Sequence, residues 1–137
     1  MHHRKKVKSL GKVARKRNAL LRSMAIALIK SGRIKTTLVK AKVLRPYIEK
    51  IISRARRSEG IAVVRSLRRD FNAETVALLT QKWAPIFKDR KGGYVRINKL
   101  VARVSDASPM AYIEFVEQPK EREKKAKAGD SKANKGK

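Results

Sequence analysis

The residues best able to do chemistry in this 137-residue chain are cations that gather near its N-terminus. Fifteen Lys or Arg residues lie between Arg4 and Arg45, and the first acidic residue is Glu49. A cation that binds a phosphate releases a condensed counterion, and six to ten such contacts make affinity fall by roughly 10³ to 10⁵ between 50 and 200 mM salt. The net charge of +26 opposes compaction unless a polyanion neutralises it. This pattern predicts a broad phosphate-rich partner, and nucleic acid fits better than an acidic membrane or protein.

A second candidate site lies later in the chain, where two glycines stand among basic residues. Arg90, Lys91 and Arg96 flank Gly92-Gly93 and Tyr94. One interpretation is a turn whose glycines supply positive φ. The other adds close approach of the backbone to phosphate, with the tyrosine ring stacking on a base or ribose, and the two are compatible. The spacing of a nucleotide-hydrolase phosphate loop is absent.

The chain lacks the residue combinations that an enzyme needs. Its only histidines are His2 and His3, it has no cysteine, and we expect no metal or other cofactor. The longest apolar run, residues 24–29, is far shorter than the roughly 20 residues that span a bilayer. We therefore expect no enzymatic activity, no membrane partner and no small-molecule substrate. We interpret the acids in the body of the chain as caps, turn residues or partners of nearby arginines: Glu49, Asp70, Glu74, Asp89, Asp106 and Glu114.

A folded body must position these cations, and its first element is a helix that follows a basic arm. We interpret residues 1–12 as an arm that becomes ordered on its polyanion. A helix is expected from residue 13 or 14 to residue 31, because Leu21, Met24, Ala25 and Leu28 recur at the spacing of one buried face. Gly32 follows as a helix stop.

A short β-type run at residues 33–36 and a second helix to about residue 57 come next. A hydroxyl of Thr36 or Thr37 is expected to cap this helix. Pro46 removes a backbone donor and clashes with the preceding turn, which predicts a kink or break near residues 42–45. The expected apolar face comprises Leu38, Ala41, Leu44, Ile48, Ile51, Ile52 and Ala55.

Two further helices are expected in the C-terminal half. The first would span residues 61–71 and turn Ile61, Val64 and Leu67 inward. Asn72 would cap the second, over residues 73–83, with Pro85 ending it.

Two strands and a tail complete the chain. Residues 94–104 and 110–116 predict strands that are antiparallel to each other, with Ala111, Ile113 and Phe115 facing the helices. Residues 117–137 have too little apolar surface to offset the entropy of ordering, which predicts a disordered tail. The expected organisation is one α+β domain over residues 13–116.

Several long sequence blocks carry a family resemblance. They are HRKKxxxLG, RNALLRSMAxxLIKxGRIKTTLxKAKxLRPxxEKII, DRKGGYxRIxKL and MAYIEFVE. In these blocks the chain resembles the bacterial-type large-subunit ribosomal protein L-seventeen family, over about residues 1–116. The resemblance implies about four helices on a small mixed β-sheet, without catalysis. It also implies binding to 23S ribosomal RNA in the cytoplasm, on the solvent side of the large subunit, beside other ribosomal proteins near the peptide-tunnel outlet.

The expected RNA-binding residues come from two sources. By matching position, the resemblance implies His3, Arg4, Lys5, Lys6, Arg17, Asn18, Arg22, Arg33, Thr36, Thr37, Lys40, Lys42, Arg90, Gly92, Gly93, Tyr94 and Arg96. The charge pattern adds Lys8, Lys12, Arg15, Lys16, Lys35, Arg45 and Lys91. The chain also departs from the family, with Val43 where Glu is usual and Ser105 in a turn usually built as Arg-x-Gly-Asp.

Two functions from different classes fit these residues. The first is a structural constituent of the large ribosomal subunit, and the second is an architectural DNA-binding protein of the nucleoid type. Charge alone does not separate RNA from DNA, and the block resemblance favours the first. Aromatic residues make up only 5% of the chain, so binding to the backbone and shape of a folded nucleic acid is expected rather than base stacking.

Overall fold

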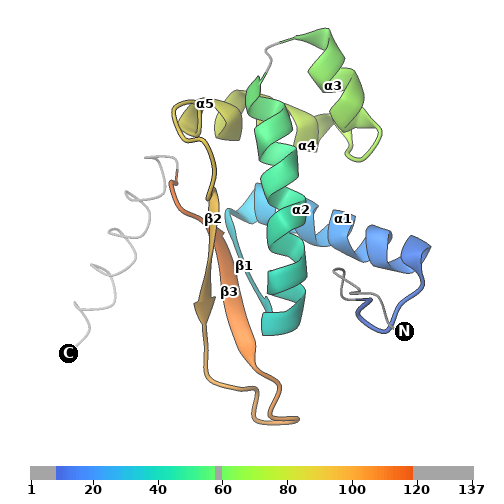
Figure 1. Cartoon of the computed structure of the whole chain (residues 1–137), viewed down its shortest axis with the longest axis vertical. Coiled ribbons are helices and arrows are strands. Elements are labelled where there is room, and N and C mark those ends of the chain that lie inside the picture. Colours follow the sequence, from blue (N-terminus) through green and yellow to red (C-terminus); the bar gives the residue numbers. More distant parts are fainter. Residues whose placement is uncertain (1–8, 58–59, 119–137) are drawn as a thin grey trace, which may run out of the picture.

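A computed structural model describes residues 9–57 and 60–118, which form a set of helices packed against a small sheet (Figure 1). The elements in chain order are α1 (Ala14–Ser31), β1 (Arg33–Thr37), α2 (Leu38–Arg57), α3 (Ile61–Arg68), α4 (Ala73–Ala77), the π-helical turn η1 (Leu78–Trp83), α5 (Ala84–Ile86), β2 (Val95–Lys99) and β3 (Met110–Phe115). The expected α+β class is confirmed. Most of the predicted arm, residues 1–8, and most of the predicted tail, residues 119–137, lie outside the described residues.

The sheet is antiparallel throughout, where a mixed sheet was expected. Its strand order is β1-β3-β2, so the last strand of the described chain is the central one. β1 and β2 run in the same direction, but β3 lies between them and pairs antiparallel with both, so no parallel pair forms. The predicted antiparallel pairing of the last two strands is confirmed, although β2 ends at Lys99 rather than residue 104.

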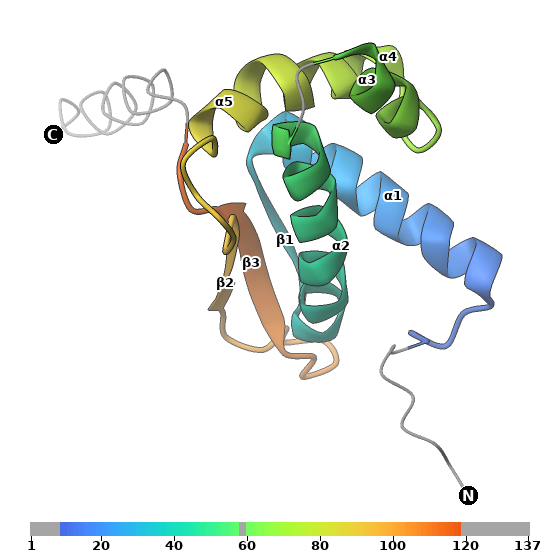
Figure 2. The ribbon, with the colours of Figure 1, turned by 45° about the horizontal axis from the view of Figure 1, so that its top comes forward.

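Alternation along the strands gives the sheet two different faces. Ile34, Ile113 and Ile97 stand side by side in register on the face that packs against α2. Ala111, Ile113 and Phe115 are fully buried, as predicted. The other face carries polar and charged side chains, and no helix of the described chain covers it (Figure 2).

The first helix and its stop agree with the sequence. α1 buries Leu21, Ala25 and Leu28 along one face. Gly32 adopts φ 73°, and its N–H donates to the carbonyl of Leu28 at 2.6 Å, which satisfies one of the orphan carbonyls at the helix end. The Gly32 carbonyl in turn accepts from the N–H of Phe115 at 3.2 Å, so the end of α1 is fixed to the end of β3.

The second helix differs from its prediction at two points. α2 runs from Leu38 through Pro46 as one helix, which excludes a break, one of the two expected effects of the proline. Its first N–H donates to the carbonyl of Pro109 at 2.8 Å, so a backbone group of the β2–β3 connection supplies a partner where a threonine cap was expected. The predicted apolar face is confirmed, and Val43 packs partly buried beside it.

The shorter helices gather at the far end of α2 (Figure 1). α3 ends at Arg68, earlier than expected, and Ile61 is 73% exposed while its neighbour Val63 is buried. The inward direction predicted for Ile61 was therefore wrong, because the short helix presents Val63 and Leu67 to the core instead.

The fourth helix confirms its cap and corrects its end. The Asn72 side chain accepts from the Thr75 N–H at 3.1 Å. The helical path then widens into η1, where the Ala84 N–H donates back to Leu79, and it continues through Pro85 to Ile86. A π-type widening is a recognised way to absorb an interruption of the hydrogen-bond ladder, so the proline does not terminate the helix.

Candidate nucleic-acid interface

The uncovered face of the sheet carries a compact group of charged side chains. Arg33 of β1 and Arg96 of β2 lie on either side of Glu114 of β3, at the same level of the sheet. One step along the strands, Lys35 and Asn98 flank Tyr112 in the same way. We call these six residues the open-face cluster. Since strand register determines which side chains meet, this cluster exists only in the folded sheet.

Glu114 organises the cluster. Its side chain is only 6% exposed, whereas those of Arg33 and Arg96 are 50% and 57% exposed. Oε1 accepts from Arg96 Nε at 2.6 Å and from Asn98 Nδ2 at 2.8 Å, and Oε2 lies 3.7 Å from Arg33 Nε. A buried carboxylate is stable only when its oxygens are matched by donors. The two arginines satisfy it while keeping much of their surface in solvent.

Arg33 has a second restraint. Its guanidinium carbon lies 3.7 Å from the centre of the Tyr112 ring, a cation–π arrangement. A guanidinium that is stacked and paired has little rotational freedom left to lose when it binds a phosphate. The open-face cluster therefore presents two oriented arginines rather than two freely moving ones.

A second group of cations lies along the start of α1. Lys12, Arg15 and Lys16 are exposed and have no acidic partner within the part of the chain that the structure describes. Arg17 donates to the carbonyl of Lys12 at 3.4 Å, which holds the approach to the helix. Asn18 is exposed on the same part of α1.

Further along α1, Arg22 behaves differently. It forms an ion pair with Asp70 at 2.9 Å, and Arg54 approaches the same carboxylate at 4.0 Å. Tyr47 is near this group, and its pKa is raised chiefly by burial and also by Asp70. Binding of a phosphate by Arg22 would compete with this internal pair, so its predicted role stays a prediction.

The junction between β1 and α2 adds further cations. Lys35 and Lys42 are exposed and Lys40 is half-buried, and none of the three has an acidic partner among the described residues. Thr36 and Thr37 are half-buried beside them. Arg45 approaches Glu49 at 3.9 Å, one helical turn away.

The glycine turn after α5 is only partly as expected. Gly93 has φ 67°, which confirms the interpretation as a turn with positive φ at that residue. Its N–H donates to Glu49 at 3.2 Å, and its carbonyl accepts from Arg90 at 3.1 Å. Arg90 also pairs with Glu117 at 3.1 Å. Lys91 and Gly92 remain exposed, and a Cβ at either glycine would meet open space.

Tyr94 is the clear correction in this group. It is fully buried, with its ring edge-on to Phe87 at 5.2 Å and its hydroxyl 3.5 Å from Ser53 Oγ. Phe87, Trp83 and Phe115 continue this aromatic core. The stacking role expected for the tyrosine ring was wrong, because the ring fills the space between α2 and the sheet. The arm residues His3, Arg4, Lys5, Lys6 and Lys8 lie outside the described residues.

Five of the six acids serve as ion-pair partners, and Asp89 lies in the turn after α5, both within the roles predicted for them. Ion pairs to cations are formed by Glu49, Asp70, Glu74, Asp106 and Glu114. Within the described ranges, no three His, Cys, Asp or Glu side chains come together in a group suited to a metal ion. None of the described helices is both long and apolar enough to cross a membrane.

The fold and the surface define a class: a small basic α+β protein whose cations line an uncovered sheet face and the start of a helix. Comparison with known proteins specifies the family. The family model described as ribosomal protein L17 matches residues 20–116. The chain belongs to the ribosomal protein L17 family.

The relatives agree with this assignment. Over 119 residues the chain is 48% identical to the large ribosomal subunit protein bL17 of Campylobacter concisus, a match that covers 85% of this chain and 98% of that protein. It is 50% identical to the protein of the same name in Campylobacter jejuni, covering 85% of this chain and 99% of the relative. A third relative, from Persephonella marina, is 45% identical over 122 residues, covering 87% of this chain and 98% of the relative. Membership of a ribosomal protein family decides against both an enzyme and the nucleoid alternative.

Proposed function

We propose that this chain is a structural constituent of the large ribosomal subunit in the cytoplasm, where it binds and stabilises folded 23S rRNA through phosphate and shape contacts. The observation that carries the proposal is that a member of the ribosomal protein L17 family presents cations without acidic partners along the start of α1 and at the β1–α2 junction. Such cations neutralise phosphates so that RNA segments can approach one another.

The open-face cluster supplies a second kind of contact. Arg33 and Arg96 are oriented by Glu114, and a planar guanidinium matches phosphate geometry. The unpaired lysines contribute affinity that depends on charge, and the oriented arginines select a particular arrangement of phosphates. Together they suit an RNA surface of defined shape. We further propose neighbouring large-subunit proteins near the peptide-tunnel outlet as partners, an expectation that rests on the family resemblance.

The test removes charge without breaking an internal ion pair. We would replace Lys35, Lys40 and Lys42 with Gln, which keeps most of the side-chain length. If each lysine contacts one phosphate, the slope of log affinity against log salt for 23S rRNA becomes shallower by about 2 to 3. Incorporation of the variant into large subunits should fall accordingly, measured by sedimentation of cell lysates.

The matched control removes the same charge elsewhere. Arg65, Arg68 and Arg69 are exposed at the opposite end of the molecule and none has an acidic partner in the described part of the chain. Their replacement with Gln should change the salt slope by less than about 1. Equal losses in both variants would show that only total charge matters. A wild-type protein that sediments with DNA, outside the large-subunit peak, would overturn the ribosomal role itself.

A further inference from the structure

The connection between β2 and β3, residues 100–109, has a chemical character unlike the rest of the surface. It projects beyond the sheet at the end away from the short helices (Figure 1). Val101 and Val104 are 91% and 103% exposed, and Ala102 and Ala107 are exposed beside them. Single exposed apolar residues are ordinary on protein surfaces. Here four of them share one projecting tip, which is a feature of interaction sites.

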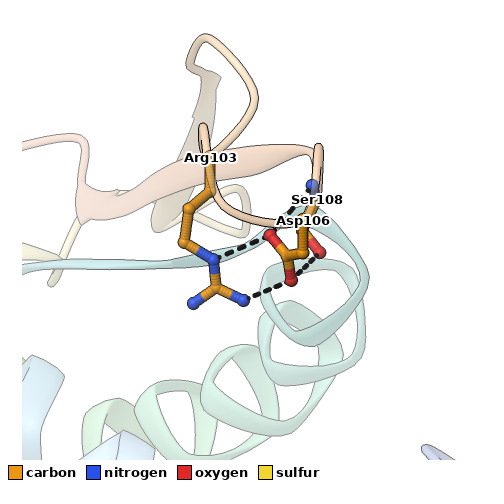
Figure 3. A network of polar contacts seen from close by, with 3 residues as sticks. All are labelled: Arg103, Asp106 and Ser108. Atoms are coloured by element: carbon orange, nitrogen blue, oxygen red, sulfur yellow. Dashed lines mark hydrogen bonds and ion pairs between the residues drawn. The ribbon is translucent and has the colours of Figure 1, made fainter.

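The tip is also electrically neutral. Its one cation, Arg103, and its one anion, Asp106, hold each other through two bonds, Nε to Oδ1 at 2.9 Å and Nη2 to Oδ2 at 2.7 Å (Figure 3). In a chain of net charge +26, this segment therefore offers no uncompensated cation. A phosphate would have to displace Asp106 before it could bind Arg103.

The tip has a defined shape before any partner arrives. The Arg103 N–H donates to the Ser108 carbonyl at 2.9 Å, which continues the hairpin beyond the regular ladder. Asp106 accepts from the hydroxyl of Ser108 at 2.7 Å and from its N–H at 3.2 Å. Ser105, where the family usually has Gly, needs no positive φ, because the left-handed position falls on Ala107 at φ 52°. A preset loop loses little entropy on binding.

We propose that residues 100–109 dock by Val101 and Val104 into an apolar recess of a neighbouring ribosomal protein, and not on RNA. Valine side chains carry no group that reads a base edge or a phosphate, whereas apolar contacts form the buried centre of protein–protein interfaces. The Arg103–Asp106 pair would then lie at the polar rim, where it keeps the loop shape. This inference rests on the proposed ribosomal function and assigns a protein-binding role to a surface distinct from the cationic ones.

The test places an aliphatic diazirine amino acid at position 104 of the full chain, in cells that incorporate the variant into large subunits. After irradiation of purified subunits, we expect a discrete protein–protein adduct that survives ribonuclease, identified by mass spectrometry. The same probe at Lys16 should give an adduct that ribonuclease degrades. With the probe kept at position 104, Val101→Asp should lower the adduct yield about tenfold or more, because it places a charge in an apolar contact. Ile61→Asp, at the exposed start of α3, should leave the yield unchanged.

The possible results of this experiment test the docking role separately from the proposed ribosomal function. Suppose that the chain enters large subunits and that the probe at Lys16 gives the expected RNA adduct. An RNA adduct at position 104, or no adduct there, would then overturn the docking role alone. Failure of the wild-type chain to enter large subunits overturns the proposed function and this inference with it. A ribonuclease-resistant adduct that Val101→Asp leaves undiminished would also count against docking by the valines.

Discussion

Replacing Glu114 with Gln tests whether the arginines of the open-face cluster act through orientation or only through charge. The side chain keeps its volume, and in place of a carboxylate oxygen Arg96 and Asn98 have only an uncharged and weaker amide acceptor. The charge is lost, and the amide nitrogen replaces an oxygen beside Arg33. Removing Glu114 also removes a negative charge from a surface that faces phosphate in our proposal. Charge alone therefore predicts tighter RNA binding, and orientation predicts weaker binding.

The structure sets the expected magnitudes. Hydrogen bonds to a charged group contribute about 1.5–3 kcal/mol each. Arg33 and Arg96 are half-exposed and become rehydrated when released, so the net loss of folding free energy should be about 1–2 kcal/mol. For RNA, reordering two arginines costs about 0.5–1.5 kcal/mol each, partly offset by about 0.5 kcal/mol from the lost acid. The balance of about 0.5–2.5 kcal/mol corresponds to roughly tenfold weaker binding.

The assays are urea unfolding for stability and filter binding of 23S rRNA at fixed salt. Glu74→Gln is the matched control, because it makes the same charge change in an exposed pair with Lys30, on α4. It should destabilise the fold by less than about 1 kcal/mol and leave RNA binding equal or slightly tighter. If Glu114→Gln binds RNA as tightly as the wild type or more tightly, the orientation argument is wrong.

Three further predictions concern the fold and the tip. Trp83→Phe removes the hydrogen bond from Trp83 Nε1 to the Ile29 carbonyl at 2.9 Å in a buried site. Urea unfolding should show a loss of about 1–3 kcal/mol in the free energy of unfolding; an unchanged free energy would mean that the bond does not contribute to stability. Asn72→Ala should cost about 1 kcal/mol in the same assay while Asn72→Asp retains the cap; equal stability of the two variants would contradict the capping role. The Arg103 guanidinium, with Ser108, holds the pKa of Asp106 well below its usual range. Because this folded-state pKa is depressed, the contribution of the pair to stability is present above the unfolded value of about 3.9 and is lost only as pH falls through the lower folded value. Carboxyl NMR should show Asp106 ionised well below pH 3.9 and Arg103→Ala restoring an ordinary titration, and an ordinary titration in the wild type would refute the pairing.

Local sequence patterns were sufficient for several elements. The stripe of α1, its stop at Gly32 and the apolar face of α2 each depend on residues within a few turns of one another, so spacing alone predicts them. The Asn72 cap is local in the same way. The identity of the acids as ion-pair partners also followed from composition, because few acids stand among many cations.

Other features depend on tertiary structure that spacing does not contain. Tyr94 stands among arginines and glycines in the sequence, yet its ring is buried in the core against Phe87. The organising position of Glu114 follows from the register of three strands that are far apart in the chain. Alternation along residues 110–116, which places Glu114 on the face opposite Ile113, was the one local signal that could have shown it. Pro85 looked like a terminator because a switch to π-helical bonding has no simple sequence signature.

The central place of β3 has a consequence for synthesis and folding. β3 is the last element of the described fold, and both other strands bind to it rather than to each other. While the ribosome that makes this chain has not yet released Met110–Phe115, Arg33 and Arg96 have neither a sheet nor Glu114 to hold them. The arginines are therefore oriented only after Met110–Phe115 has been released, by a long-range pairing of the kind that slows folding. Before then the open-face cluster does not exist, so in our proposal its arginines contribute to RNA recognition only after β3 is inserted.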